Sequence, residues 1–364
     1  MKVLHVEAGR NLYGGAQQVL YLLEGLHARG IHNVLACPRG CALARAAAPF
    51  AQVHEMPMWG DMDFLMALRL YRLMRRTRPD IVHLHSRIGA DVMGGIAARL
   101  HRVPVVYSRR QDNPEPPWSV RLKYRLHDRV IAISEGIAQV KLAEGLSPQR
   151  LRVVRSVVDG STYLGTPETT WFRAEFGLPD GARTLAVVAQ LIERKGHLVL
   201  LQALPPLLQE FPDLQVLFFG KGPLDAQLRE AIRAGGMEDR VCLAGFRGDL
   251  PRILPCLDLL VHPAYREGLG VSLLQASAAG VPIVACRAGG IPEAVRDGVN
   301  GLLVPPGDVN ALREAIARLL RDPDLARAMG DAGRDLVAKE FSLDRMVEGN
   351  LAVYREVLAE KGRG

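Results

Sequence analysis

Long hydrophobic runs are missing from this sequence of 364 residues. No stretch approaches the roughly 20 apolar residues that a membrane-spanning helix needs. The opening residues, MKVLHVEAG, hold too short an apolar run for a signal peptide, because Glu7 interrupts it. We therefore expect a protein that is either soluble or bound to a membrane from one side.

Cysteine is also scarce, with five residues scattered along the chain. Cys37 and Cys41 form the one close pair, and no second pair or nearby histidine cluster in the sequence completes a zinc site. An odd number of cysteines without a disulfide framework is typical of a reducing compartment. The sequence thus predicts a cytoplasmic protein without a metal site.

Several nucleotide and metal motifs are absent. The segments GKGPLD and GLGVSL both lack the third glycine of G-x-G-x-x-G, and neither a P-loop nor an H-E-x-x-H pattern occurs. These absences argue against a dinucleotide oxidoreductase, a P-loop enzyme and a zinc protease of that type.

Charge is present but unevenly placed. The net charge is +7, and the excess of lysine and arginine lies in residues 1–160, whereas residues 161–364 are slightly acidic. A basic half favours an anionic partner such as membrane lipid, a phosphorylated acceptor or nucleic acid. A solubilising surface explains the same charge equally well, so both interpretations stay open.

Short apolar, β-branched runs alternate with longer helical segments in both halves of the chain. In the first half we expect strands at 2–6, 80–84, 104–107 and 130–133, and helices at about 15–29, 62–77, 87–101 and 135–144. In the second half we expect strands at 184–191, 214–219, 241–245, 258–261 and 282–285, and helices at about 197–210, 223–234, 249–256, 270–279 and 308–320.

This alternation predicts an α/β protein with two doubly wound, Rossmann-like domains, each a parallel sheet covered on both faces. We expect an N-terminal domain at 1–160 and a C-terminal domain at 168–340, joined by a loop. Two helices follow residue 323, and the last, at about 342–360, is expected to pack back on the first domain. Ligands of such sheets bind at the carboxyl ends of the strands, so the cleft between two facing domains is the predicted site.

Glycines precede helices at three of these strand ends. Gly14 and Gly15 follow the first strand, and Lys195 with Gly196 follows the first strand of the second half. Backbone N–H groups at a glycine-rich helix start suit an anion, and a bound polyanion would offset the unfavourable lysine there. A simple turn and a surface lysine are the competing interpretations.

The segment REGLGVSLLQ carries the third case. Gly268 and Gly270 free the amides of the first helical turn for a phosphate. The adjacent Glu267 would repel that anion, so we expect it to face a neutral group such as a sugar hydroxyl. Gln275 lies eight residues further on, at most about 12 Å away along a helix.

In their order along the chain, these segments resemble the retaining glycosyltransferases of family 4, which have the GT-B fold. The matching segments are GGAQ, DIVHLHS, PVVYSRR, AISEG, VAQLIERKG, FFGKGP, LAGF, HPAYREGLGVSLLQASAAGVP, AGGIPEAV and GLLVPPGD. The resemblance implies that Lys195 contacts the donor diphosphate and Glu267 the transferred sugar. It further implies that amides near Gly268, Leu269, Gly270 and Val271 hold phosphate, that Gly14 and Gly15 lie near the diphosphate, and that Gly245 and Phe246 flank the nucleobase.

Three positions depart from the family pattern. The second glutamate, which holds the ribose, is Gln275, and the arginine usually paired with the lysine is Gln190. The usual histidine after PVVY falls at Arg110, next to Arg109. One of these arginines would replace the missing cation, which makes Glu267, Lys195 and Arg110 the predicted catalytic residues. His85, at the end of a strand, joins Arg109 and Arg110 on the acceptor side, whereas His83 is expected to be structural.

The resemblance implies transfer of a sugar from a nucleotide diphosphate sugar, UDP- or GDP-linked, without a cofactor or metal. The acceptor is a saccharide or a lipid-linked molecule of cell-envelope polysaccharide or lipopolysaccharide synthesis, and no nucleic acid partner is expected. Basic amphipathic segments at 63–79 and 118–129 favour contact with an anionic membrane, although ordinary surface helices would look the same.

Two other functions stay open on the sequence. A nonhydrolysing nucleotide-sugar 2-epimerase shares the fold and the donor, so the fold alone does not exclude it. A non-catalytic nucleotide-sugar-binding scaffold is the second, because Gln190, Gln275 and Arg110 depart from the catalytic pattern.

Overall fold

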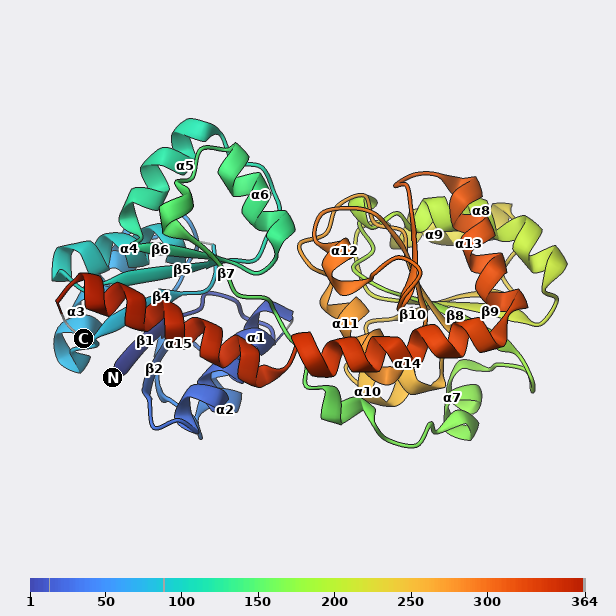
Figure 1. Cartoon of the computed structure of the whole chain (residues 1–364), viewed down its shortest axis with the longest axis horizontal. Coiled ribbons are helices and arrows are strands. Elements are labelled where there is room, and N and C mark those ends of the chain that lie inside the picture. The colour runs from blue at the N-terminus through green and yellow to red at the C-terminus, as the bar shows by residue number, and fades with distance from the viewer. Residues whose placement is uncertain (13, 88, 363–364) are drawn as a thin grey trace. The chain divides into compact units, whose positions relative to one another are not determined.

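The computed structural model describes residues 1–12, 14–87 and 89–362. The chain forms two compact units, Met1–Val157 with Leu343–Gly364, and Val158–Ser342. In Figure 1 the chain is coloured from blue at the N-terminus to red at the C-terminus, so the first unit combines blue and teal segments with a red helix. Each unit has its own parallel sheet and is described by itself below.

The first unit contains a seven-stranded sheet in the order β3-β2-β1-β4-β5-β6-β7, with every pair parallel. The predicted strands correspond to β1, β4, β5 and β6, whereas β2, β3 and β7 were not predicted. Its strands are β1 (Lys2–Val6), β2 (His32–Pro38), β3 (Gln52–Met56), β4 (Ile81–Leu84), β5 (Val105–Arg109), β6 (Arg129–Ala132) and β7 (Leu151–Val153).

Helices cover both faces of this sheet. Helix α1 packs with α2 and α15, and α3 packs with α4. The predicted helix at 87–101 begins at Ala90, and residue 88 lies outside the described residues. The helices are α1 (Gly14–His27), α2 (Ala42–Ala47), α3 (Phe64–Thr77), α4 (Ala90–His101), α5 (Pro117–Lys123), α6 (Glu135–Ala143) and α15 (Leu343–Glu360).

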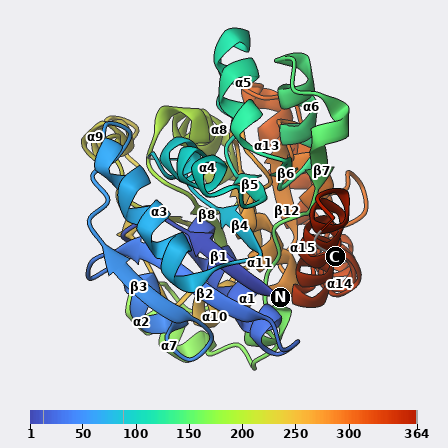
Figure 2. The same cartoon turned by 90° about the vertical axis from the view of Figure 1, so that its left-hand side faces the viewer.

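Helix α15 completes the core of the first unit, although it lies at the far end of the sequence. In Figure 2 it lies beside α1. Its buried Val347, Leu351 and Val357 belong to one hydrophobic cluster with Val3 of β1 and Leu22 of α1. The hydroxyl of Tyr354 is also 2.5 Å from Nδ1 of His83. The helix is therefore part of the first unit's fold rather than an appendage.

The second unit contains a six-stranded parallel sheet in the order β10-β9-β8-β11-β12-β13. All five strands predicted for this half are present, and β13 was not predicted. The strands are β8 (Arg183–Val188), β9 (Leu214–Phe219), β10 (Val241–Gly245), β11 (Leu259–His262), β12 (Ile283–Cys286) and β13 (Gly301–Val304).

The helices of the second unit bury Leu200 and Leu204 of α8 and Leu312 and Ile316 of α13 in one core with the sheet. Among the described helices, none combines the length and apolar character that crossing a membrane would need. The helices of the second unit are α7 (Thr169–Phe176), α8 (His197–Glu210), α9 (Asp225–Ala234), α10 (Leu250–Ile253), α11 (Val271–Ala279), α12 (Ile291–Ala294), α13 (Val309–Arg321) and α14 (Pro323–Glu340).

Both sheets reverse their strand order at one point, between β1 and β4 in the first unit and between β8 and β11 in the second. The connections after these neighbouring strands go to opposite faces, which leaves a crevice at their carboxyl ends. The predicted site segments follow these four strands, so the topology brings them together in pairs within each unit.

Candidate active site

Lys195 lies in the connection between β8 and α8. It ends a short 3-10 turn, Glu193–Lys195, and Gly196 follows in the left-handed conformation with φ of 70°. A Cβ atom on Gly196 would lie 1.9 Å from the carbonyl oxygen of Pro263, which follows β11. Glycine is therefore required here by both conformation and space. The close approach packs the Lys195 segment against the segment that carries Glu267.

The backbone of Glu267 is held by the loop that contains Gly289 and Gly290. Its carbonyl oxygen accepts a hydrogen bond of 3.0 Å from the N–H of Gly290. A Cβ atom on Gly289 would lie 2.1 Å from the same oxygen. One carboxylate oxygen accepts a bond of 3.1 Å from the N–H of Gly268. Backbone contacts thus fix the position of this acid on both sides.

The other carboxylate oxygen of Glu267 meets two basic side chains. The Nζ atom of Lys195 forms an ion pair with it, and Nε2 of His262 lies 2.9 Å away and donates a hydrogen bond. Burial raises the pKa of Glu267, but His262 and Lys195 outweigh that effect and hold the pKa well below its ordinary value. Burial lowers the pKa of His262, with Glu267 opposing the change. The group is thus an ionised acid in contact with a lysine and a buried histidine.

Helix α11 begins next to this acid. Gly270 is its N-cap, with φ of 87°, and as a glycine it has no side chain to cap the first amides. Gly268, Leu269 and Gly270 are buried, and Val271 is half-buried. The positive end of a helix and its uncapped N–H groups favour an anion, so this helix start can hold a phosphate.

Four other residues predicted for the donor, Gln190, Gly245, Phe246 and Gln275, lie in the same unit, whereas Gly14 and Gly15 lie in the first unit. Gln275 is half-buried on α11, and Gln190 is exposed directly after β8. Gly245 ends β10 with φ of 72°, and the next residue, Phe246, has an exposed fraction of 51%. An exposed aromatic ring at a strand end can stack on a nucleobase.

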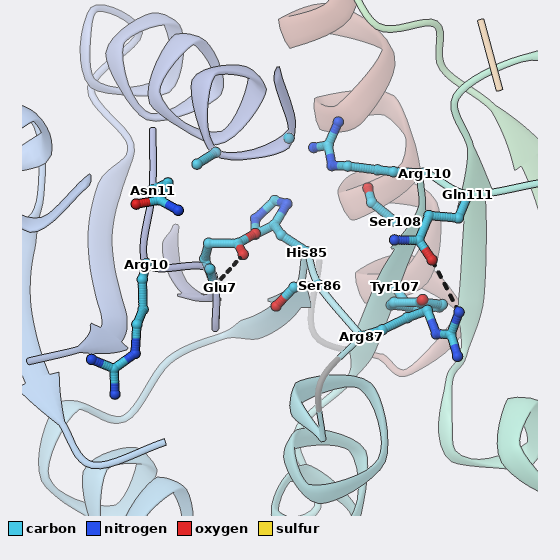
Figure 3. A pocket seen from close by; sticks show the side chains of 13 residues that line it. Glu7, Arg10, Asn11, His85, Ser86, Arg87, Tyr107, Ser108, Arg110 and Gln111 are labelled. Carbon is cyan, nitrogen blue, oxygen red and sulfur yellow. Dashed lines mark hydrogen bonds between the residues drawn. The ribbon is translucent and has the colours of Figure 1, made fainter. Parts of the chain in front are cut away.

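The first unit has a separate polar pocket of about 390 Å³ at the carboxyl ends of β1 and β4. Glu7, His85 and Arg110 line it from three strand ends, and Figure 3 shows Glu7 and His85 side by side with Arg110 nearby. Gly15 lies at the start of α1 on the same wall, and Gly14, the neighbouring residue, is exposed. The other lining residues are Gly9, Arg10, Asn11, Ala16, Ser86, Arg87, Tyr107, Ser108 and Gln111.

Glu7 was missed as a functional residue. It is buried, and its Oε1 atom accepts a hydrogen bond of 2.8 Å from the N–H of Gly9. Burial raises the pKa of this carboxyl group, although Gly9 and the charge of Arg110 oppose the rise. A carboxyl group directly after a buried strand was the available signal, because the connections after strands β8 and β11 of the second unit carry Lys195 and Glu267.

Arg110 and Arg109 have different surroundings. Arg110 is half-buried at the pocket wall, and its guanidinium lies 3.5 Å from the hydroxyl of Ser156. Arg109 is fully buried and pairs with Glu115 at 3.4 Å. This burial and pairing neutralise the charge of Arg109 in the interior, and its predicted role on the acceptor side or as a replacement cation stays a prediction. A role for Arg110 toward the diphosphate stays a prediction.

Three buried histidines lie together beneath the pocket. Atoms of His5, His83 and His85 that could bind a metal lie within 4.8 Å of one another. His5 Nδ1 is 2.9 Å from His85 Nε2, and His83 Nε2 is 2.8 Å from the Ser108 hydroxyl. The His83 and His85 rings are tilted by 37° with centroids 3.8 Å apart. Both ring nitrogens of His83 already have partners, the hydroxyls of Tyr354 and Ser108. The cluster is thus a hydrogen-bonded network, and His83 is structural as expected.

Comparison with known proteins matches both halves of the chain. The family described as Glycosyl transferases group 1 matches residues 169–336, and Glycosyltransferase Family 4 matches residues 13–161. The 2-deoxystreptamine glucosyltransferase of Streptomyces kanamyceticus is 30% identical over 312 residues, covering 80% of this chain and 81% of that protein. The lipopolysaccharide core biosynthesis glycosyltransferase LpsE of Rhizobium meliloti is 26% identical over 366 residues, covering 99% and 100%.

Among solved structures, Anabaena HepE in complex with UDP-glucose has a TM-score of 0.85 and 22% identity, covering 99% of this chain and 100% of that one. At that identity the likeness shows the fold, which is GT-B. The two family matches, the full-length relatives and the paired parallel sheets agree. The chain belongs to glycosyltransferase family 4 and is an enzyme of the hexosyltransferase type.

Proposed function

We propose that this enzyme transfers a hexosyl group, with retention of anomeric configuration, from a UDP- or GDP-linked sugar to a saccharide or lipid-linked acceptor. The observation that carries the proposal is the contact of Lys195 with Glu267 beside the uncapped start of α11. This arrangement offers positive charge for a diphosphate and an acid for a neutral sugar within one strand-end crevice.

Charge separation explains why these groups are needed. When the bond between the sugar C1 and the phosphate oxygen breaks, the sugar becomes positive and the diphosphate gains negative charge. Lys195 and the amides near Gly270 would stabilise the leaving diphosphate. Glu267 would accept hydrogen bonds from sugar hydroxyls, and its fixed backbone would position the ring for reaction.

Transfer to the acceptor needs no protein side chain as a dedicated base. The acceptor oxygen bonds to C1 on the face from which the diphosphate departs, and its proton passes to a diphosphate oxygen. The pocket with Glu7, Asn11 and Ser108 supplies polar groups that suit a saccharide. We therefore assign the acceptor to the pocket of the first unit, with Arg110 as its cation.

We propose UDP as the nucleotide of the donor. HepE was solved with UDP-glucose, which favours UDP among the two candidate nucleotides. Phe246 is the ring that we expect to lie against the base. Gln275 would hold the ribose through neutral hydrogen bonds, which are weaker than those of a glutamate.

We place the reaction at the inner face of the cytoplasmic membrane, in cell-envelope polysaccharide or lipopolysaccharide synthesis. The relative LpsE acts in lipopolysaccharide core biosynthesis, which supports this pathway. All five cysteines are free, as in proteins of reducing compartments. A membrane contact would bring the enzyme to a lipid-linked acceptor.

We further propose that the reaction requires no metal. Lys195 and the start of α11 provide the positive charge that a metal supplies in other transferases. Treatment with a chelator, followed by assay with and without added Mg²⁺ or Mn²⁺, should leave the transfer rate unchanged. A rate that depends on either ion would contradict this proposal.

The function is tested in two stages. Thermal shifts with UDP, GDP and their sugars identify the donor, because a bound ligand stabilises the folded state. The best donor is then incubated with and without a cell-envelope extract, and the products are analysed by NMR for linkage and anomeric configuration. Transfer that requires the extract and retains configuration supports the proposal.

Two other outcomes would overturn it. Epimerised nucleotide sugar formed without an acceptor would indicate a 2-epimerase. Donor binding without turnover, across extracts that support a related transferase, would indicate a non-catalytic scaffold.

A further inference from the structure

Five large apolar side chains are exposed in one continuous segment of the first unit. They belong to the loop that precedes α3 and to the first two turns of that helix. Their exposed fractions are 70% for Trp59, 78% for Met62, 66% for Phe64, 59% for Leu65 and 43% for Leu68. Exposed apolar residues are ordinary when scattered, but a contiguous group marks a surface that contacts something else.

Helix α3 separates its side chains between an inner and an outer face. Met66, Leu70, Leu73 and Met74 are buried against the unit. On the opposite side, Phe64, Leu65 and Leu68 are followed along the helix by three exposed arginines, since residues three and four apart share a face. These are Arg72, Arg75 and Arg76. We call the five apolar residues and these three arginines the α3 surface.

The three arginines lack acidic partners within the described part of the chain. Exposed arginines elsewhere in the protein are often paired, as Arg321 is with Glu210 and Arg252 with Glu168. Three neighbouring cations without carboxylates leave a strong local positive potential. Such a potential attracts a polyanionic partner.

The shape of the α3 surface is held by one buried acid, Asp63. Its carboxylate caps the helix by accepting from the N–H of Met66 at 3.1 Å, and it accepts from the N–H of Trp59 at 3.1 Å. It also pairs with Arg69, whose guanidinium lies 5.3 Å from the centre of the Trp59 ring. Loop and helix are therefore tied together, so the apolar group is displayed in a fixed arrangement.

An anionic lipid bilayer fits both the apolar residues and the arginines of the α3 surface. Tryptophan, methionine, phenylalanine and leucine side chains gain by entering the region between headgroups and acyl chains. Arginines on the same helix face then lie at the level of lipid phosphates, which they bind strongly. A nucleic acid would satisfy the arginines but would leave the apolar side chains against water.

A second basic segment, helix α5, fits a membrane less well. It exposes Trp118 and Leu122, but its Lys123 pairs with Glu115 and lies 3.2 Å from Asp91. The lysine therefore serves the interior of the unit rather than its surface. Of the two basic segments that the sequence singled out, the α3 surface carries the stronger case.

We propose that the α3 surface docks the enzyme on anionic membranes, with its apolar residues inserted at the interface and Arg72, Arg75 and Arg76 on lipid phosphates. This proposal identifies the surface that makes the membrane contact of the proposed function, and its biological purpose rests on that function. The docking itself needs neither donor nor acceptor, so it is tested without either.

The test uses the full chain and vesicles of phosphatidylcholine, alone or mixed with phosphatidylglycerol. Binding is measured by co-sedimentation, and insertion by the blue shift of Trp59 fluorescence in a Trp118→Phe, Trp171→Phe background. One variant combines Arg72→Glu, Arg75→Glu and Arg76→Glu. A second combines Leu65→Ser with Leu68→Ser, and its control replaces two exposed apolar residues of the other unit, Leu164→Ser with Val299→Ser.

We expect binding to the mixed vesicles alone, with a Trp59 blue shift. Charge reversal should lower the partition coefficient by about 100-fold or more, since each arginine contributes roughly one kcal/mol near an anionic surface. The serine pair should lower it at least tenfold, and the control should bind like the parent. Equal binding by parent and both α3 variants, or no binding of the parent, would overturn the proposal.

Thermal shifts with the donor separate this result from the proposed function. Both α3 variants should keep the parent's nucleotide-sugar binding, because their residues are far along the sequence from the donor segments and belong to the other unit. Loss of vesicle binding with donor binding intact assigns the effect to docking. Retained docking with no transfer activity would instead contradict the reaction proposed above.

Discussion

The Glu267 carboxylate is in contact with a lysine and a histidine and is held by the amide of Gly268. These neighbours hold its pKa well below the ordinary value of 4.5, so the carboxyl group is ionised at neutral pH. An ionised acid is a strong acceptor for hydroxyl groups. The same residue can therefore position a sugar and keep Lys195 in place for a diphosphate.

We expect Glu267→Gln to lower kcat by about 100-fold or more, because an amide binds sugar hydroxyls more weakly and releases Lys195. The measurement is steady-state transfer with the donor identified above. Glu230→Gln, on the exposed surface of α9, serves as the control and should keep parental activity. Near-normal turnover by Glu267→Gln would remove this acid from the site.

Glu267→Gln should also change how the free energy of unfolding depends on pH under acidic conditions. A carboxyl group whose pKa is lowered on folding stabilises the protein above its unfolded pKa, and the stabilisation is lost as the pH falls below it. The free energy of unfolding should therefore fall more steeply in the parent than in Glu267→Gln between about pH 5 and pH 3. Urea unfolding at several pH values measures this, and identical slopes would contradict the prediction.

Gln275 offers a third prediction at this scale. Gln275→Glu should tighten donor binding several-fold, because a carboxylate forms charge-assisted hydrogen bonds with a ribose diol. Calorimetric titration with the nucleotide diphosphate measures the change. An unchanged Kd would mean that this position on α11 does not face the nucleotide.

Single residues were predicted unevenly from the sequence. Lys195 and Glu267 could be singled out because glycines and helix starts follow them. His262 was missed because it is the last residue of a buried strand. Glu7 was noted only as the residue that interrupts the first apolar run, not as a site residue. The burial of Arg109 could not be predicted, because its partner, Glu115, is brought to it by a loop whose path the sequence does not reveal.

At the scale of elements, the active-site geometry depends on how closely two connections pack. Gly196 allows the connection after β8 to touch Pro263 after β11. The backbone N–H of Tyr265 also donates to the carbonyl of Arg194 at 2.9 Å. Together these contacts set the separation of Lys195 and Glu267.

Gly196→Ala should therefore damage both stability and activity. Gly181→Ala is a matched control, because Gly181 has a similar φ of 74° but open space around its Cβ position, whereas Gly196 meets Pro263. We expect the control to lower the free energy of unfolding by about 1 kcal/mol and Gly196→Ala by more than twice that. Chemical denaturation measures the difference, and equal losses would show that the close contact is unimportant.

Elements with strong patterns were predicted well. The strands at 2–6, 214–219 and 241–245 and the helix at 197–210 have the bounds that the apolar runs predicted. The strands β2, β3 and β7 were missed, because β3 is polar at the sheet edge and β2 and β7 mix charged or small residues with apolar ones. Helix α7 was also missed, at the edge of the expected linker.

At the scale of the whole molecule, the first unit is built from two distant parts of the chain. Residues 1–157 supply its sheet, and α15 supplies one side of its core through Leu351, Tyr354 and Val357. The α15 packing was expected from the sequence, because a final amphipathic helix without a following strand must bury its apolar face on existing structure. The partner residues could not be named in advance.

Removing residues 343–364 should leave the first unit unable to fold stably, since the deletion exposes the apolar cluster that includes Val3 and Leu22. The second unit should keep its own core. Limited proteolysis of the truncated chain should degrade residues 1–157 and spare 158–342. A truncation after residue 360, at the end of α15, is the control, and equal protease resistance in both chains would contradict the expectation.

The late position of α15 also bears on how the protein is made. Ribosomes add about 5–20 residues per second, so roughly 10–40 s separate the emergence of residue 157 from that of the final helix. Throughout that interval the nascent first unit carries an uncovered apolar face, while the second unit can finish folding. Folding of the nascent first unit should therefore depend on chaperones that shield this face until α15 has emerged.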